Sequence, residues 1–258
     1  MKKISLLFLG LSLLVPLSAI TVDELLYNFD RSLNVPSIQG EFHVTLISQK
    51  GDEREIKARI YQKKVDDNQE NRLFLFDFPA TVRGTGLLLH SYFDERDNSM
   101  WIYLPAVKRI KRIALESSGG GYFMGSDFTY RDLVSNDRKD MEFEILEETV
   151  MDGVDCYVIK SQGKTDLIRQ DMGYSSTISY HRKDNFMLHR REFYDLSGDL
   201  EKIYRAEGFL DLSPAIYPTD ISMTNVQTGH KSVIKILDAS TEEIPDRIFT
   251  TRYLEGKR

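Results

Sequence analysis

Apolar and polar residues alternate along most of the chain, and this period of two predicts β-strands. A strand with this pattern has one face in water and the other in a core. Two such runs, at residues 41–47 and 55–60, flank a turn at Gly51-Asp52, and so short a turn predicts an antiparallel pair. The apolar positions expected to face inward on this pair are Phe42, Val44, Leu46, Ile56 and Ile60.

The run at residues 73–78 is apolar at nearly every position. Such a run predicts a strand that is covered on both of its faces. We expect Phe74 and Phe76 to face inward, although Leu73 and Leu75 are also apolar and leave the choice of face open.

Further alternating runs follow, separated by turns that contain glycine, aspartate and asparagine. They cover residues 141–161, 178–194, 201–209 and 220–237. Many short strands with turns between them predict one large antiparallel sheet that is curved or nearly closed. The expected fold class is therefore mainly β (α+β).

Two helices are expected, one at each end of this series. Thr21 is followed three residues later by Glu24, which is the spacing of a capping box, and an apolar stripe at helical intervals comes next. Residues 244–250, with Pro245 in the first turn, predict a short C-terminal helix.

The first nineteen residues have the pattern of a targeting segment. Two lysines precede a mostly apolar run, and small residues follow it. The run is short for a membrane span, so residues 1–19 predict a secretory signal peptide that is cleaved near Ala19, with an uncleaved anchor as the alternative. Residues 20–258 are then expected to form a single exported domain.

Charge and hydropathy narrow the class of partner. The net charge of -6 and the pI of about 5.5 argue against nucleic acid, because binding phosphates requires a basic surface. The mean hydropathy of -0.36 is typical of a soluble mature chain. The single cysteine, Cys156, lies in an apolar run and is expected to be a small buried residue.

The sequence carries no recognisable catalytic motif. Its five histidines are scattered without metal-ligand spacing, and it has no Gly-x-Ser-x-Gly motif and no phosphate loop. We therefore expect no enzymatic activity, no metal and no cofactor. Asp127 and Asp132 lie among aromatic residues and are expected to have structural roles rather than to form an acid–base pair.

Residues 100–133 combine several unusual features in one stretch. The stretch opens as a strand, continues with a basic run and then reaches Gly119, Gly120 and Gly121, which predict a hinge. The basic run is either the solvated face of a strand or a docking surface for anionic headgroups or an acidic partner; it consists of Lys108, Arg109, Lys111 and Arg112. The aromatic residues after the glycines are either a loop that completes the core or a lid over a cavity; they include Phe123, Met124 and Phe128.

A curved sheet with one apolar face can hold an apolar ligand, although an ordinary filled core would show the same pattern. If a cavity exists, its lining is expected to be Phe42, Val44, Leu46, Ile56, Ile60, Phe74, Phe76, Trp101 and Tyr103.

Three pieces of the 100–133 stretch resemble the signature of LolA-like outer-membrane lipoprotein-sorting proteins, in the longer branch of that superfamily. They are the strand at residues 101–105, the basic run at residues 108–113 and the segment at residues 124–133. The resemblance implies a half-barrel whose short helices cover a hydrophobic cavity. It also implies a periplasmic carrier that works without a cofactor.

The same resemblance implies that lipoprotein acyl chains or another lipid are the cargo, with an inner-membrane exporter as donor and an outer-membrane acceptor. Shorter relatives gate the cavity with an arginine, for which Arg59, Arg83 and Arg109 are the candidates here. Sensor domains share this fold, so a non-transport sensor or interaction module remains the alternative function.

Overall fold

The computed structural model describes residues 20–114, 121–134 and 138–256. The predicted signal peptide, together with Gly119 and Gly120 of the predicted hinge, lies outside these ranges. The α-helices of the described chain are α1 (Val22–Ser32), α2 (Asp166–Met172) and α3 (Thr251–Leu254). Its strands are β1 (Ser37–Ile47), β2 (Glu53–Asp66), β3 (Gln69–Phe78), β4 (Gly86–Tyr92), β5 (Ser99–Leu104), β6 (Arg109–Ile113), β7 (Met141–Met151), β8 (Val154–Gly163), β9 (Ser176–Arg182), β10 (Leu188–Tyr194), β11 (Leu200–Leu212), β12 (Ala215–Asn225) and β13 (Lys231–Ser240).

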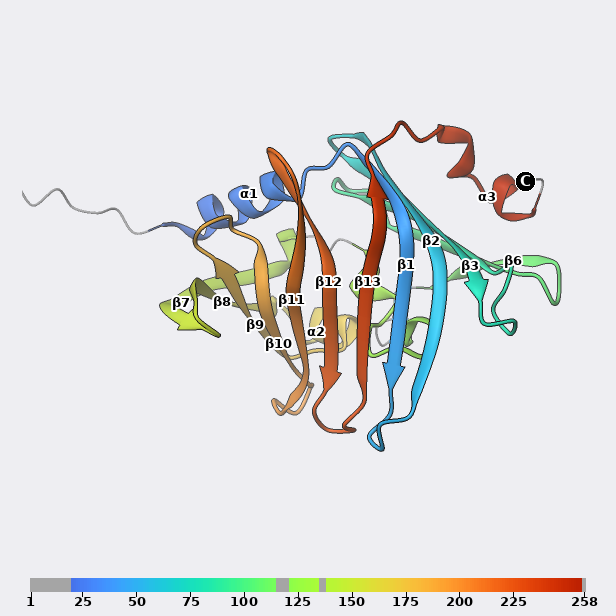
Figure 1. The fold of residues 1–258 in the computed structure, drawn as a ribbon. Coiled ribbons are helices and arrows are strands. Elements are labelled where there is room, and N and C mark those ends of the chain that lie inside the picture. The colour runs from blue at the N-terminus through green and yellow to red at the C-terminus, as the bar shows by residue number, and fades with distance from the viewer. Residues whose placement is uncertain (1–19, 115–120, 135–137, 257–258) are drawn as a thin grey trace, which may run out of the picture.

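All of these strands lie in one antiparallel sheet, in the order β6-β5-β4-β3-β2-β1-β13-β12-β11-β10-β9-β8-β7. Pairing of β1 with β13 joins the N-terminal strands to the C-terminal ones. The sheet curves back on both sides of β13, β1 and β2 and forms an open trough (Figure 1). This arrangement confirms the predicted fold class, a mainly β chain with a curved antiparallel sheet.

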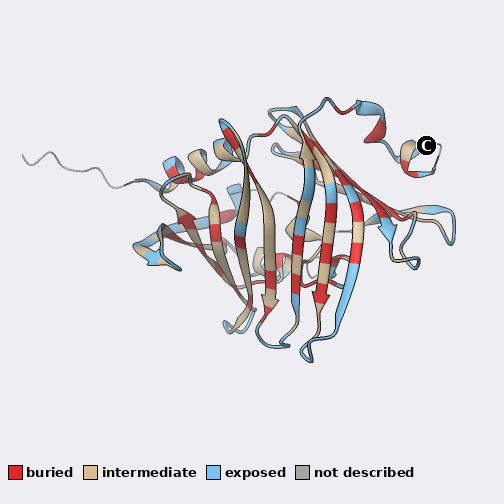
Figure 2. Ribbon diagram, in the orientation of Figure 1, coloured by how far each residue is buried: buried red, intermediate tan, exposed pale blue. Residues whose placement is uncertain are grey.

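Strand β3 is covered on both faces, as its apolar run predicted. Phe74 and Phe76 join a large buried cluster on one face, which we call the inner cluster on the inner face. Leu73 and Leu75 join a separate cluster on the outer face. Buried residues form bands across β1, β2 and β13 in Figure 2, which agrees with the alternation read from their sequences.

The cover on the outer face is the C-terminal part of the chain, residues 244–254, which we call the outer segment. The predicted C-terminal helix is in fact a 3₁₀ turn (Asp246–Ile248) followed by α3. The outer segment buries its apolar side chains against β3, β4 and β5, so it does not cover the inner face. A Cβ atom added at Gly86 would lie 2.6 Å from Leu254 Cδ2, so the missing side chain at that position makes room for α3.

Helix α1 begins as its capping residues predicted, because the Thr21 hydroxyl accepts a hydrogen bond from the Glu24 backbone N–H. Helix α2 was not predicted, although Thr165 caps its start and Gly173 ends it in the left-handed conformation. It packs closely on β8, where a Cβ atom at Gly163 would lie 2.7 Å from Ile168.

No helix among the described residues is both long enough and apolar enough to cross a membrane. Cys156 is fully buried, as predicted.

Candidate functional site

The inner face of the trough carries the apolar side chains that the alternation placed there. Seven of the nine residues predicted to line a cavity belong to the inner cluster, each with at most 4% of its surface exposed. They come from three adjacent strands and are Phe42, Val44, Leu46, Ile56, Ile60, Phe74 and Phe76.

The other two predicted lining residues, Trp101 and Tyr103, lie on the opposite face. Both pack against the outer cluster, and Trp101 also lies edge-on to His90, with ring centroids 5.0 Å apart. The alternation within β5 explains the difference, because Met100 and Ile102 take the inward positions instead. The structure thus corrects the expected placement of this tryptophan and tyrosine.

Residues 122–134, which we call the inner segment, cover the apolar inner face. Phe123 is fully buried and lies against three phenylalanines of the sheet, with centroid distances of 6.3 Å to Phe42, 5.8 Å to Phe74 and 6.1 Å to Phe76. Phe128 is 4% exposed and joins the same cluster. The aromatic residues predicted to act as a lid therefore lie against the predicted lining.

The inner segment holds its own shape through short-range hydrogen bonds. The Phe123 N–H donates to the Phe128 carbonyl at 2.7 Å, and the Ser126 N–H donates to the Phe123 carbonyl at 2.8 Å. Met124 adopts a left-handed conformation (φ 52°), which closes the tight turn between these two bonds. The segment is therefore a compact loop.

Asp127 attaches the inner segment to β13 and the turn before it. Its Oδ2 atom lies 2.7 Å from His230 Nδ1 and accepts a hydrogen bond from the Ser232 hydroxyl at 2.6 Å. Ser232 Oγ in turn accepts from the Asp127 backbone N–H at 2.9 Å. Asp127 is only 5% exposed, so these partners satisfy a carboxylate that would otherwise be costly to bury.

A second polar attachment comes from Lys202 on β11, which is 1% exposed. Its ammonium group donates to the Asp127 carbonyl at 3.2 Å and lies 3.7 Å from Asp132 Oδ2. It also lies over the rings of Tyr174 and Phe193, 4.7 and 5.5 Å from their centroids. Both aspartates thus have the structural roles that the sequence predicted.

Arg72 on β3 makes the third attachment, by donating to the Leu133 carbonyl at 3.0 Å. The three arginines proposed from the sequence as gating residues lie elsewhere in the molecule. Arg59 pairs with Asp77 at 3.1 Å, Arg83 donates to the Asp77 carbonyl at 3.1 Å, and Arg109 is exposed on an edge strand.

Sequence reasoning missed Arg72, Lys202, His230 and Ser232. Each occupies an inward position of a strand or lies next to one, where the alternation predicts an apolar residue. A charged residue in an inward position was the available signal for Arg72 and Lys202.

The four basic residues predicted to dock headgroups or a partner are all exposed on or beside the edge strand β6. They are Lys108, Arg109, Lys111 and Arg112. A shallow hollow of about 380 Å³ is lined by Val107, Arg109 and Lys111. Arg112 points to the opposite face, because it pairs across the strands with Trp101.

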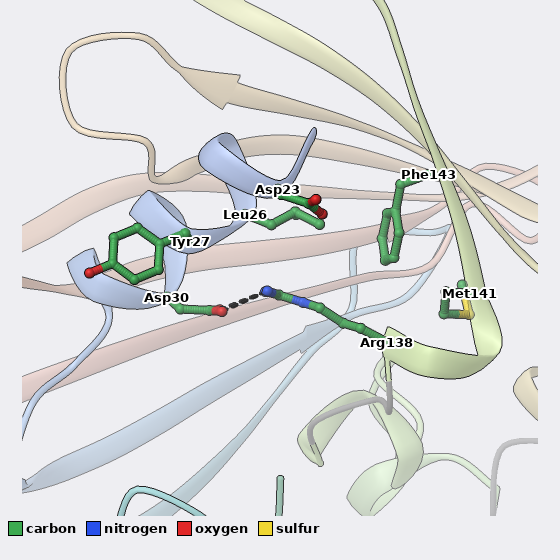
Figure 3. A pocket seen from close by; sticks show the side chains of 7 residues that line it. All are labelled: Asp23, Leu26, Tyr27, Asp30, Arg138, Met141 and Phe143. Carbon is green, nitrogen blue, oxygen red and sulfur yellow. Dashed lines mark hydrogen bonds and ion pairs between the residues drawn. The ribbon is translucent and has the colours of Figure 1, made fainter. Parts of the chain in front are cut away.

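A second hollow of about 380 Å³ lies between α1 and the opposite edge strand, β7 (Figure 3). Arg138 reaches across it and pairs with Asp30 through two contacts of 2.6 Å. Leu26, Met141 and Phe143 supply its apolar walls. The hollow therefore combines an exposed ion pair with a partly apolar floor at the open edge of the sheet.

The described residues contain no group of histidine, cysteine and carboxylate side chains that could hold a metal ion. His181 is 2% exposed and packs edge-on against Phe29 of α1, with ring centroids 4.9 Å apart. Burial disfavours its charged form and lowers its pKa to about 4, so this histidine is neutral at physiological pH.

Known proteins of the same architecture identify the family. A family model described as an uncharacterized protein matches residues 68–256, which is most of the chain, whereas no curated protein matches it. A structure described as an outer-membrane lipoprotein-sorting protein domain, from Vibrio parahaemolyticus, is 25% identical with a TM-score of 0.82; the match covers 90% of this chain and 97% of that one.

Two further structures agree with this match. A DUF1329 family protein from Desulfovibrio piger is 25% identical over 90% of this chain and 96% of its own, with a TM-score of 0.82. A LolA superfamily protein from Nitrosomonas europaea has the same fold at 23% identity, with a TM-score of 0.69 and coverage of 91% and 100%. The chain therefore belongs to the family of this uncharacterized-protein model, and it has the LolA-like fold of these outer-membrane lipoprotein-sorting and LolA superfamily domains.

Proposed function

We propose that this protein is a periplasmic carrier that binds acyl chains of lipoproteins or lipids on its inner face and moves them between the inner and outer membranes. One observation carries the proposal: an aromatic segment attached by polar contacts covers an apolar trough. Phe123 occupies the place against Phe42, Phe74 and Phe76 that an acyl chain would take. Displacement of the inner segment would open that place without disturbing the strands.

The energetics of acyl chains in water support a carrier. Each methylene group removed from water contributes about 0.8 kcal/mol, so exposing a sixteen-carbon chain costs on the order of 13 kcal/mol. An acyl chain that crosses an aqueous compartment therefore needs an apolar container. Such a container has to be covered when it is empty, and the inner segment supplies a cover.

Export and docking complete the proposal. Residues 1–19 act as a signal peptide that is removed near Ala19, and residues 20–258 form one carrier domain. An inner-membrane exporter delivers the cargo and an outer-membrane acceptor receives it. The exposed basic residues beside β6 dock anionic headgroups or an acidic partner during this transfer, and they are Lys108, Arg109, Lys111 and Arg112.

Extraction of the purified protein tests the proposal. The mature chain is purified without detergent, extracted with organic solvent and analysed by mass spectrometry, and its binding of a fluorescent fatty acid is measured. We expect acyl-bearing molecules in the extract and saturable binding of the probe. Absence of both would refute the carrier function.

The alternative is a non-transport sensor or interaction module with a filled core. The complete burial of Phe123 favours this alternative, because a side chain with no exposed surface is also what an ordinary core contains. A module of this kind would fold stably, retain no lipid and leave the probe unbound.

A further inference from the structure

Arg191 on β10 is a charged residue on the inner face of the trough. It precedes Phe193, a member of the inner cluster, by two residues, so the two side chains project from the same face of the strand. Its cross-strand partner on β11 is Tyr204, which packs against the inner cluster. The guanidinium group therefore lies at the border of the apolar surface proposed to hold acyl chains.

This guanidinium group has no counter-ion among the described residues. Its Nε atom donates to the Ser179 hydroxyl at 2.7 Å. No described carboxylate oxygen lies within 4.0 Å of its nitrogen atoms, the distance limit for an ion pair. Other arginines of the same sheet are paired: Arg190, on the opposite face of β10, lies 2.7 Å from Glu192, and Arg72 lies 2.7 Å from Glu70. Among the described residues, the half-buried Arg191 thus differs from Arg190, its neighbour in the chain, in having no acidic partner.

The surroundings of Arg191 favour an added negative charge. Burial lowers the pKa of its guanidinium group, and the charge of Arg138 lowers it further, whereas Tyr204 and Asp132 raise it. A lowered pKa means that the surroundings disfavour the positive charge, and a bound anion would offset this effect. Burial also raises the pKa of Tyr204, so its hydroxyl keeps its proton and remains a hydrogen-bond donor. Within the described chain, this hydroxyl makes no hydrogen bond of its own.

The free groups match the geometry of an oxyanion. With Nε held by Ser179, the two terminal nitrogens of Arg191 form a planar fork, and such a fork binds a carboxylate or a phosphate through two parallel hydrogen bonds. Tyr204 is the cross-strand partner of Arg191 on the next strand and interacts with it electrostatically, so its hydroxyl can supply a third donor. From this point the inner face continues through Phe193 into the apolar cluster.

We propose that Arg191 and Tyr204 bind the oxyanion headgroup, a carboxylate or a phosphate, of an amphiphile whose acyl chain lies on the inner cluster. This inference rests on the proposed carrier function and names the class of its cargo. The carrier then selects acidic amphiphiles over neutral ones of the same chain length.

A competition experiment with matched ligand pairs tests the headgroup site. Displacement of a fluorescent fatty acid from the mature protein is measured with palmitate against methyl palmitate, and with palmitoyl lysophosphatidic acid against monopalmitoylglycerol. A charge-assisted hydrogen bond contributes about 1.5 to 3 kcal/mol, so we expect the acidic member of at least one pair to bind about tenfold or more tightly. The pair with the larger preference identifies the carboxylate or the phosphate as the natural headgroup.

Two variants on the same strand assign the preference to its residue. Arg191→Gln is expected to remove the tenfold preference and to leave binding of the neutral ligands unchanged. Arg190→Gln changes the same residue type on the opposite face and is expected to keep the preference. Tyr204→Phe, which removes only a hydroxyl, provides a second reading if Arg191→Gln does not fold, with an expected partial loss of the preference.

The outcomes separate the two proposals. Equal affinity for the acidic and neutral members of both pairs in the wild-type protein overturns the headgroup site and leaves the carrier function standing. Failure of all four ligands to displace or to bind overturns the carrier function itself. A preference that survives Arg191→Gln and Tyr204→Phe overturns the assignment to these two residues.

Discussion

The inner and outer segments cover opposite faces of the same strand, β3, and they are attached in different ways. The outer segment buries Ile244, Ile248, Phe249 and Leu254 against leucines of the sheet. The inner segment also buries aromatic residues, but two of its three polar attachments involve buried charges. The outer segment has polar contacts as well, which involve the side chains of Lys63, Asp246 and His90, but none of these side chains is buried. Apolar packing is non-directional, whereas a satisfied network of buried polar groups fixes one arrangement.

The difference suggests a permanent cover on one face and a removable cover on the other. Buried ion pairs and hydrogen bonds contribute little net stability compared with apolar packing, because desolvation offsets much of their attraction. These ion pairs and hydrogen bonds do, however, fix one closed position of the inner segment. A cover that closes in one position and opens at modest cost suits a trough that has to admit a ligand.

The largest effect is expected from matched phenylalanine truncations on the two faces. Phe249→Ala removes a 3% exposed side chain from the outer cluster and should lower the free energy of unfolding by about 3 to 5 kcal/mol without changing lipid affinity. Phe123→Ala removes an equally buried ring from the inner cluster, and it should tighten lipid binding because the ligand no longer has to displace that ring. Urea unfolding measures the free energy of unfolding of each variant, and titration with a fluorescent lipid measures its lipid affinity.

The same pair of variants can contradict the distinction between a permanent and a removable cover. If Phe123→Ala lowers stability as much as Phe249→Ala does and leaves lipid affinity unchanged, both segments are parts of one ordinary core.

Acid provides the next largest effect, through His181 of β9, which is buried against Phe29 of α1. Its pKa falls from 6.5 to about 4 on folding, so below pH 6.5 the unfolded chain binds a proton that the native chain does not. Stability should therefore decrease as the pH falls from about 6.5 to about 4, by roughly 3 kcal/mol, and then level off.

Urea unfolding at several pH values measures this loss, with His181→Gln as the control. Burial also lowers the pKa values of His90 and His189, so the wild-type curve contains their contributions in the same direction. The difference between the wild-type and His181→Gln curves isolates one histidine. Parallel curves would show that His181 contributes nothing to the pH dependence.

The sequence predicted the sheet better than its covers, for a physical reason. Alternation is a local signal, and it placed Phe42 and Ile60 correctly because one face of each strand is dry. Alternation did not decide which face of the sheet Phe74 lies on, since both faces of β3 are buried. It also placed Trp101 on the wrong face, because Met100 and Ile102 of the same strand are apolar too and take the inward positions.

The polar attachments were beyond the reach of local patterns. Lys202 reaches the Asp127 carbonyl 75 positions earlier in the chain, and only the paired strands show that Arg191 has no counter-ion within the part of the chain that the structure describes. What the sequence did contain was an anomaly: a charged residue at an inward position of a strand. Such a residue is either satisfied from a distant part of the chain, as Lys202 is, or available to a ligand, as we propose for Arg191.

A smaller effect is expected from Asp127→Asn, which weakens the attachment of the inner segment to Ser232 and His230. The neutral side chain keeps the shape of the aspartate but makes weaker hydrogen bonds. Local opening of residues 122–130 should become about 1 to 2 kcal/mol easier, so their amide hydrogens should exchange roughly 5- to 30-fold faster. Hydrogen exchange read by mass spectrometry measures this change, and a loss of protection spread over the whole sheet would contradict a separable cover.

The smallest effect is expected from Asp246→Asn, which removes an ion pair from the outer segment. Asp246 Oδ1 lies 2.5 Å from Lys63 Nζ, but the aspartate side chain is 82% exposed, and solvent screens such a pair. Lys63 keeps its hydrogen bond to the Ile244 carbonyl at 2.9 Å, so the loss in unfolding free energy should stay below about 1 kcal/mol by urea denaturation. A loss above about 2 kcal/mol would mean that this exposed ion pair stabilises the outer segment strongly, and the distinction between a permanent and a removable cover would no longer rest on the kind of attachment.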